Sequence, residues 1–157
     1  ISGAPEAAAD DYARFAKLPA PRREPVAWSH FIEQLRSQVD FVTDGAIDGI
    51  ARLDAAQLEQ CLLNLLKNAH ESGSAPGDVQ LSLRRMPEAW RIDVLDRGQG
   101  MNEAVLANAL LPFYSTKRHG TGLGLALARE IAEAHGGRIA LRNREGGGLC
   151  VSLVLPD

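Results

Sequence analysis

The stretch AAQLEQCLLNLLKNAHES, residues 55–72, carries the strongest helical pattern in the chain. Its apolar residues recur every three or four positions, so one side of a helix from about 55 to 71 must face a core. Asn64 and Asn68 lie one turn apart at the edge of that side, where an unpaired amide is costly to bury. From this stretch alone, the two amides either face solvent or point their oxygens into a binding site. The predicted core positions are Leu58, Cys61, Leu62, Leu65, Leu66 and Ala69.

Two antiparallel hairpins are predicted on the C-terminal side of this helix. Residues 79–96 alternate apolar and polar side chains around the turn MPEA, and residues 138–156 do so around a glycine run. On the N-terminal side, Ser29 is a candidate N-cap for a helix that runs to about Asp40. Helices interleaved with hairpins predict an α+β fold with one mixed sheet and helices packed on one face. Two further short strands are expected near residues 40–43 and 46–54.

Residues 1–25 differ from the rest of the chain. APEAAADDYARFAKL has helical spacing, and PAPRREP then places three prolines in seven residues. Because proline removes a backbone donor and favours an extended predecessor, this second segment is expected to be stiff and non-helical. We therefore expect residues 1–25 to be a short helical tail and a linker, and residues 26–157 to form the domain proper.

The overall composition excludes several classes of protein. The 157 residues carry a net charge of −3 and a pI of about 5.8, which argue against a broad nucleic-acid surface. No apolar stretch of about 18 residues is present, so we expect no membrane span. Cys61 and Cys150 lie in apolar surroundings, where buried free thiols are expected, and no Cys/His spacing typical of zinc occurs.

The stretch DRGQGMN, residues 96–102, places a carboxylate and two glycines directly after a predicted strand. Glycines at alternate positions let the backbone bend sharply. One interpretation is an ordinary strand-to-helix turn with an Asx cap. The other is that a buried Asp96 accepts a hydrogen bond from the exocyclic amine of adenine.

The stretch PFYSTKRHGTGLGLALA, residues 112–128, places basic and polar side chains before three glycines at alternate positions. A helix is expected to begin near Gly122 and to end near His135, with Gly136 and Gly137 at its C-cap. Backbone N–H groups and the positive end of that helix predict an anion site, most simply for phosphate. The spacing fits neither the P-loop, nor the dinucleotide fingerprint, nor the protein-kinase motif set.

Together and in this order, the segments resemble the ATP-binding catalytic domain of bacterial sensor histidine kinases of the GHKL superfamily, of the nitrogen-regulation type. The resemblance covers about residues 26–157. In addition, DYARFAKLPAP (11–21) resembles the exit from the dimerisation helices of such sensors, which implies that residues 1–25 are a tail and linker from upstream dimerisation helices. Five motifs carry the resemblance. NLLKNA (64–69) is similar to the N box, and PFYSTK (112–117) is similar to the F box. DRGQGM (96–101), GTGLGLALA (120–128) and GGG (146–148) are similar to the first, the second and a degenerate third glycine box.

This resemblance implies a Bergerat fold, an α/β sandwich with a mixed, mostly antiparallel sheet of about five strands, and ATP or ADP with Mg²⁺ as cofactors. It implies that Asn68 holds Mg²⁺ and that Asp96 takes the adenine amine. Asn64 and Lys117 are the implied catalytic residues. A lid is expected over about residues 101–119, which includes Lys117. The implied nucleotide-binding residues are Asn64, Lys67, Asn68, Asp96, Gly98, Gly100, Met101, Phe113, Thr116, Lys117, Thr121, Gly122, Leu123, Gly124 and Leu125.

Two departures refine the implied activity. In the ATP-hydrolysing relatives a Glu takes the place of Asn64 and activates water, whereas an amide cannot act as a general base at neutral pH. This difference favours a kinase over a dedicated ATPase. In addition, none of the four histidines is followed by the acidic, basic and proline residues of a phosphoacceptor motif. The acceptor histidine is therefore expected outside this chain.

We accordingly expect the catalytic domain of a two-component sensor histidine kinase, which transfers the γ-phosphoryl group of Mg-ATP to a histidine on a dimerisation domain absent from this chain. The alternatives are an anti-sigma-type serine/threonine kinase and a non-catalytic nucleotide-binding regulatory module. Expected partners are the dimerisation and phosphoacceptor domain and a response regulator, without nucleic acid or membrane contact. The expected location is cytoplasmic, and the sequence leaves open whether the parent protein is anchored in the inner membrane.

Overall fold

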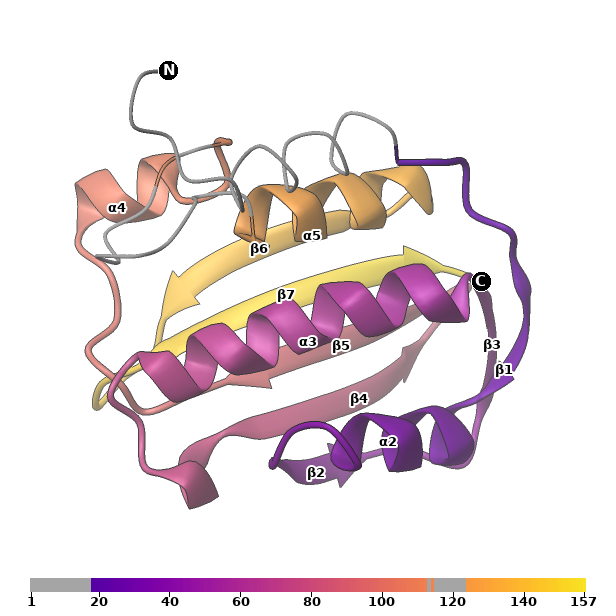
Figure 1. The fold of residues 1–157 in the computed structure, drawn as a ribbon, viewed down its shortest axis with the longest axis horizontal. Coiled ribbons are helices and arrows are strands. Elements are labelled where there is room, and N and C mark those ends of the chain that lie inside the picture. Colours follow the sequence, from indigo (N-terminus) through magenta and orange to yellow (C-terminus); the bar gives the residue numbers. More distant parts are fainter. Residues whose placement is uncertain (1–17, 113, 115–123) are drawn as a thin grey trace.

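The computed structural model describes residues 18–112, 114 and 124–157. Its elements are β1 (Glu24–Ala27), α2 (Trp28–Arg36), β2 (Val42–Gly45), β3 (Ile50–Leu53), α3 (Ala55–Glu71), a 3-10 turn η1 (Pro76–Asp78), β4 (Gln80–Met86), β5 (Ala89–Leu95), α4 (Glu103–Asn108), α5 (Gly124–Ala134), β6 (Arg138–Asn143) and β7 (Leu149–Pro156). A five-stranded sheet in the order β2-β4-β5-β7-β6 forms one layer, and α2, α3 and α5 cover one of its faces (Figure 1). The predicted α+β class is therefore confirmed.

The sheet is mixed, as predicted. Strand β2 pairs in parallel with β4, and every other neighbouring pair of this sheet is antiparallel. The two predicted hairpins are confirmed, because β4 pairs with β5 from Gln80↔Leu95 to Met86↔Ala89 and β6 pairs with β7 from Arg138↔Val154 to Asn143↔Leu149. Alternate side chains of the central strands point at the helices and form the core.

Helix α3 has the predicted bounds and lies across the middle of the sheet. Asp54 caps it, because a carboxylate oxygen accepts a hydrogen bond from the Gln57 backbone N–H at 3.1 Å. All six predicted core residues of the helix are buried. Gln57 is buried as well, and its side-chain amide donates to the carbonyl of Pro19 at 2.8 Å.

Helix α2 differs from its prediction at both ends. The N-cap is Ala27 rather than Ser29, without a side-chain capping bond. The reason is packing: Trp28 is fully buried and its backbone N–H donates to Gly49 O at 3.0 Å, which starts the helix one residue before Ser29. The helix ends at Arg36 rather than near Asp40, since the chain must turn for Val39 to pack against the core.

Strand β1 was not expected, because Pro25 makes its segment look like a linker. It pairs antiparallel with β3 in a separate two-stranded sheet, where a proline is tolerated at an edge. Strand β2 overlaps the stretch predicted at 40–43 but is shifted towards the C-terminus by two residues, and β3 lies within the stretch predicted at 46–54 but is shorter. The boundary at residue 25 between linker and domain stays a prediction.

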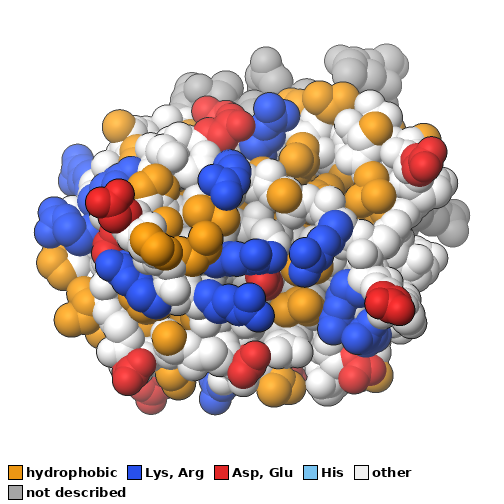
Figure 2. Space-filling model, turned by 180° about the vertical axis from the view of Figure 1, so that it is seen from behind, with side chains coloured by type: hydrophobic (Ala, Val, Ile, Leu, Met, Phe, Trp, Pro, Cys, Tyr) orange, Lys and Arg blue, Asp and Glu red, His pale blue; other side chains and the backbone are white. Residues whose placement is uncertain are grey.

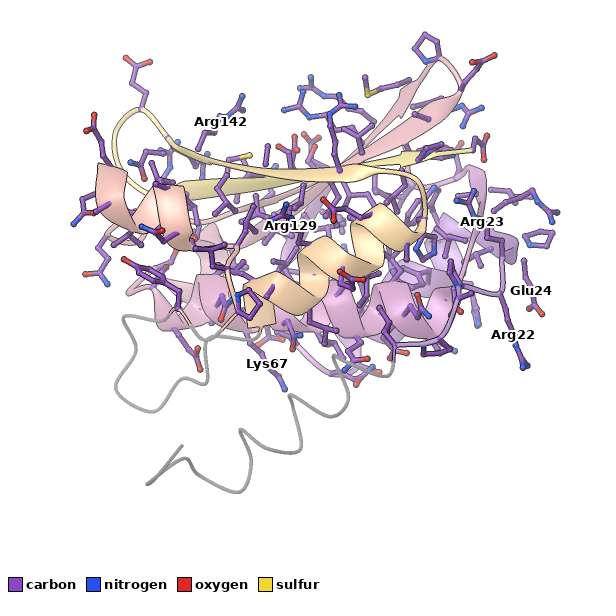
Figure 3. The ribbon with its side chains drawn as sticks, turned by 90° about the horizontal axis from the view of Figure 1, so that it is seen from above. Arg22, Arg23, Glu24, Lys67, Arg129 and Arg142 are labelled. Atoms are coloured by element: carbon purple, nitrogen blue, oxygen red, sulfur yellow. The ribbon has the colours of Figure 1, made fainter. Side chains whose placement is uncertain are left out.

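The leading segment before β1 is attached to both long helices. The Arg22 backbone N–H donates to the Asp54 carboxylate at 2.9 Å, and the Arg23 guanidinium donates to the carbonyl of His135. Together with the bond from Gln57 to Pro19, these contacts join residues 19–23 to the start of α3 and the end of α5. Figure 3 shows Arg22 and Arg23 at this end of the molecule.

The C-terminus of α5 has the predicted glycine cap. Gly136 has a φ of 77°, and the N–H groups of Gly136 and Gly137 donate to Glu133 O and Ala132 O, both at 2.9 Å. His135 is buried beside this cap. Its Nδ1 lies 2.8 Å from Ile131 O, and its Nε2 accepts from the Asp54 N–H at 3.1 Å.

Among the described helices, none combines the length and the apolar character that a membrane crossing requires.

Candidate nucleotide-binding site

Most of the predicted site residues that the structure describes gather at one end of the domain. The C-terminal half of α3, the start of α5, the turn after β5, helix α4 and the β6–β7 turn all lie there (Figure 1). The opposite end carries β1, β3 and the C-terminus. The described site residues therefore come from three separate stretches, namely α3, the turn after β5 and the start of α5, which the fold brings together.

The two amides of α3 lie at the edge of its buried side, as predicted. Asn64 and Asn68 are both half-buried. The Asn68 side-chain nitrogen lies 3.9 Å from the position that a Cβ on Gly124 would occupy. The amide of Asn68 thus approaches the first residue of α5, where the helix dipole concentrates positive charge.

Packing between α3 and α5 fixes this approach. Ala128 is fully buried, and the Cys61 thiol lies 4.0 Å from its carbonyl oxygen. Leu125, at the start of α5, is half-buried and packs against the core. Burial raises the pKa of the Cys61 thiol to about 12, so this group is an inert packing element rather than a nucleophile.

Asp96 is held rigidly at the end of β5. Its side chain is buried, and Oδ1 accepts hydrogen bonds from the backbone N–H groups of Gly98 at 2.9 Å and Leu149 at 3.1 Å. Its backbone carbonyl accepts from the Arg144 guanidinium at 2.8 Å. Within the described residues, both hydrogen bonds to the carboxylate go to Oδ1. A second oxygen of fixed orientation is a suitable acceptor for a ligand amine.

Gly98 is required for packing of this turn against α3. A Cβ there would lie 2.1 Å from the Ser72 hydroxyl and 2.4 Å from the Ser72 carbonyl oxygen. That same carbonyl accepts from the Gln99 N–H at 3.2 Å, and the Arg97 N–H donates to the Ser74 hydroxyl at 3.0 Å. The turn that carries Asp96 is therefore fastened to the end of the helix that carries Asn68.

Gly100 and Met101 lie against the end of strand β6. Gly100 has a φ of 69°, which favours glycine, and the half-buried Met101 packs against the core. Asn143 binds the Met101 backbone twice: its Oδ1 accepts from Met101 N at 2.9 Å, and its Nδ2 donates to Met101 O at 2.5 Å. Helix α4 follows, capped by Asn102, whose side chain accepts from the Val105 N–H at 2.9 Å.

The glycine run of the β6–β7 turn supports Asp96 from the other side. Gly146, Gly147 and Gly148 have φ values of 86°, 107° and 102°. A Cβ on Gly148 would lie 2.0 Å from the Asp96 carbonyl oxygen, so only glycine allows this approach. The Arg97 guanidinium also donates to Gly147 O at 3.0 Å, which adds a second link between this turn and the Asp96 turn.

Several supporting residues were missed by the sequence analysis, namely Ser72, Ser74, Asn143 and Arg144. They contact the site across many residues of chain, and local patterns cannot indicate such pairs. The one available signal was Asn143, an amide at the end of a predicted strand where an apolar or β-branched residue is usual.

Other predicted site residues are placed elsewhere or lie outside the described part of the chain. Lys67 is exposed, and Figure 3 shows it pointing away from the sheet. The remaining predicted residues outside the described ranges are Phe113, Thr116, Lys117, Thr121, Gly122 and Leu123. Of the predicted lid, residues 113 and 115–119 also lie outside the described ranges, whereas 101–112 and 114 are described.

The described residues contain no group of three or more His, Cys, Asp or Glu side chains that could hold a metal by themselves. An amide oxygen such as that of Asn68 fits Mg²⁺, which commonly takes one or two protein oxygens and completes its shell with phosphate and water. The donor set at this end of the domain is therefore compatible with Mg²⁺ bound together with a nucleotide.

Comparisons with known proteins agree with this geometry. Residues 53–157 match the model of the family described as histidine kinase-, DNA gyrase B- and HSP90-like ATPases. The chain is 38% identical over 136 residues to the C4-dicarboxylate transport sensor protein DctS of Rhodobacter capsulatus. The aligned region covers 84% of this chain and 20% of DctS. It is 33% identical over 161 residues to the nitrogen regulation protein NtrY of Azorhizobium caulinodans, covering 93% of this chain and 21% of NtrY.

The chain thus spans about a fifth of the length of these relatives. Among solved structures, the catalytic domain of histidine kinase ThkA superposes with a TM-score of 0.77 at 27% identity, covering 86% of this chain and 95% of that domain. The predicted fold is therefore confirmed as that of a histidine kinase catalytic domain. The chain belongs to the family of histidine kinase-, DNA gyrase B- and HSP90-like ATPases.

Proposed function

We propose that this chain is the catalytic domain of a two-component sensor histidine kinase, which binds Mg-ATP and transfers the γ-phosphoryl group to a histidine on a dimerisation domain outside the chain. The single observation that carries the proposal is that the Asp96 turn is hydrogen-bonded to the end of the helix that bears Asn68, and that Asn68 lies beside the start of α5. The groups proposed to bind the base, the metal and the phosphates are therefore held at fixed positions relative to one another.

Recognition of the base is assigned to Asp96. Two backbone N–H groups bind its Oδ1, which leaves Oδ2 to accept from the exocyclic amine of adenine. Guanine presents a carbonyl oxygen at the equivalent position, so two acceptors would face each other. The buried carboxylate therefore selects adenine, since an unpaired acceptor is expensive in a desolvated site.

Binding of the phosphates is assigned to the start of α5 and to Asn68. The N-terminal end of α5 provides a positive dipole and unpaired N–H groups for anionic oxygens. Asn68 would hold Mg²⁺ through its side-chain oxygen, with Asn64 contributing through water. The cation would supply charge neutralisation between phosphate oxygens. Lys117, Thr121, Gly122 and Leu123 are proposed to complete the phosphate site.

The identity of residue 64 determines what happens to the γ-phosphoryl group. A carboxylate at this position could deprotonate water, whereas the Asn64 amide has no basic lone pair at neutral pH. Hydrolysis is therefore slow, and the phosphoryl group is retained for an acceptor. Since phosphoryl transfer needs mainly alignment and charge stabilisation, the domain can supply both and leave the nucleophile to its partner domain.

The proposal includes a response regulator as the final acceptor and a cytoplasmic location, where ATP is available. It is tested with γ-labelled ATP and a longer fragment of the parent protein that contains the upstream helices. Acid-labile, base-stable label on histidine is the expected result, and Asp96→Asn should abolish it. Acid-stable phosphoserine on a separate protein would instead indicate an anti-sigma-type kinase, and nucleotide binding without any transfer would indicate a regulatory module.

A further inference from the structure

The face of the main sheet opposite the helices carries a row of arginines. The strand register places Arg84, Arg91, Val154 and Arg138 in line across β4, β5, β7 and β6. Arg142 lies four residues further along β6 on the same face, and Figure 3 shows it pointing away from the helices. Figure 2 shows Lys and Arg side chains gathered in the middle of this face. We call Arg84, Arg91, Arg138 and Arg142 the arginine face.

This concentration of charge is unfavourable for the domain by itself. Arg84 and Arg91 are directly opposite each other on antiparallel strands, an arrangement of like charges that destabilises a sheet. Asp93 offsets part of it, because its carboxylate accepts from Arg91 Nε at 3.1 Å. Within the described ranges, no carboxylate lies within ion-pair distance of Arg138 or Arg142. The basic excess is local, since the whole chain has a net charge of −3.

The arginine face also contains a shallow pocket. It has a volume of about 190 Å³ and is lined by guanidinium groups around small residues. Arg91 is held in place by Asp93 and by a 3.5 Å contact from its Nη2 to the Ser152 hydroxyl. Cys150 on this face is fully buried although no helix covers it, so neighbouring side chains shield the strands. The pocket is lined by Arg91, Arg138, Ala140, Arg142, Ser152 and Val154.

We infer that the arginine face is a docking surface for an acidic segment of a protein partner, whose Asp or Glu carboxylates enter this pocket. The basic groups assigned to this face are all arginines, and a guanidinium fork binds a carboxylate through two parallel hydrogen bonds. Arginine is enriched in protein–protein interfaces, whereas lysine is depleted there. Arg91, Arg138 and Arg142 surround one pocket, which can admit single carboxylate side chains of a protein.

The surface is separate from the nucleotide site, because the sheet lies between the arginine face and α3. An occupant of the arginine face can therefore bind while nucleotide is present. It would add negative charge beside Arg91 beyond that of Asp93, and so reduce the repulsion between Arg84 and Arg91. Binding should accordingly raise the thermal stability of the domain.

The inference is tested with a fluorescein-labelled peptide of alternating Glu and Ser, followed by fluorescence anisotropy against the full chain in excess ADP. Arg138→Gln with Arg142→Gln should weaken peptide binding about tenfold or more, which is the loss typical of truncated interface arginines. The matched control, Arg22→Gln with Arg52→Gln, removes the same charge from exposed positions outside this face and should bind as the unmodified chain does. Thermal melting verifies that each variant is folded.

A further variant, Arg138→Lys with Arg142→Lys, keeps the charge but removes the forks, and it should bind with intermediate affinity. Equal loss in the control pair, or no loss in the Gln pair, would overturn the inference. Binding of phosphatidylserine vesicles in preference to the peptide would also overturn it, as would undiminished binding by the Lys pair. ADP affinity, measured in parallel, should be the same in all variants and reports separately on the nucleotide site.

Discussion

The side-chain amide of Asn143 binds the backbone of Met101 through both of its polar atoms, accepting from the N–H at 2.9 Å and donating to the carbonyl at 2.5 Å. These residues are 42 positions apart in the chain. The contact joins the end of β6 to the turn that leads from Asp96 to α4. It therefore keeps the proposed base-binding turn in one conformation.

Asn143→Ala should weaken ADP binding about tenfold, because two hydrogen bonds of about 1 kcal/mol each no longer order the turn. Isothermal titration calorimetry measures the affinity. Asn108→Ala is the matched control, since among the described residues its side chain bonds within α4, to Ala104 O at 2.8 Å, and its ADP affinity should be unchanged. Equal affinities in the two variants would show that the Asn143 contact has no role in binding.

Asp96→Asn should lower ADP affinity about 10- to 100-fold while the domain stays folded. The amide oxygen can still accept from Gly98 and Leu149, but the new NH₂ group faces the adenine amine as a second donor. The discrimination between ADP and GDP should largely disappear. Calorimetry with both nucleotides measures it, and an unaltered preference for ADP would remove the base-binding role of Asp96.

Asn68→Ala should abolish the increase in ADP affinity that Mg²⁺ provides, because the amide oxygen proposed to hold the cation is lost. The measurement compares ADP titrations in Mg²⁺ and in EDTA. In EDTA, the variant and the unmodified chain should bind alike. If Mg²⁺ strengthens ADP binding equally in both, the cation is held by other groups.

Gly98→Ala should lower the free energy of unfolding by about 1–3 kcal/mol, the usual cost of overpacking. The added methyl group would collide with the Ser72 hydroxyl and also with its carbonyl oxygen, so Ser72→Ala cannot rescue the variant. Urea denaturation measures the change. Gly77→Ala is the control, because nothing lies within 4 Å of its Cβ position, and it should have little effect. Comparable stabilities for the two variants would contradict the close packing described at Gly98.

The domain should lose stability in alkali through Cys61. Its thiol has a pKa of 9.0 in the absence of burial and about 12 when folded, so above pH 9 the unfolded chain releases a proton that the folded domain retains. The stabilisation is complete below pH 9 and is lost as the pH rises towards 12, at up to about 1.4 kcal/mol per pH unit. Urea denaturation from pH 8 to 10.5 measures this slope.

Cys61→Ala should reduce that slope, whereas Cys150→Ala keeps the Cys61 thiol and should preserve it. Identical pH profiles in the two variants would mean that Cys61 ionises equally easily in the folded domain. In the unmodified chain, Cys61 should also resist alkylation until the domain unfolds.

Features with a strong local period were predictable from the sequence. The bounds of α3, its six core positions and both hairpins follow from apolar spacing, and the Gly136 cap follows from its residue type. The start of α2 was wrong because burial of Trp28 outweighs the capping preference of Ser29. Strand β1 was missed because Pro25 is tolerated only through its pairing with β3, a contact that no local pattern contains.

The proposed site shows the same division. Asp96, Asn68 and the glycines could be predicted because their residue types are unusual for their positions, and their roles in a site stay predictions. Ser72 and Asn143 could not be predicted, because their contacts join distant segments of the chain. Lys67 is exposed and points away from the sheet, and its role in nucleotide binding also stays a prediction.

The attachment of residues 19–23 has a mechanical consequence. These residues bind the start of α3 and the end of α5, while the opposite ends of both helices border the proposed nucleotide site. A helix of 17 residues such as α3 is a stiff rod of about 25 Å. A displacement of residues 19–23 would therefore act on both helices at the ends opposite to Asn68 and Gly124.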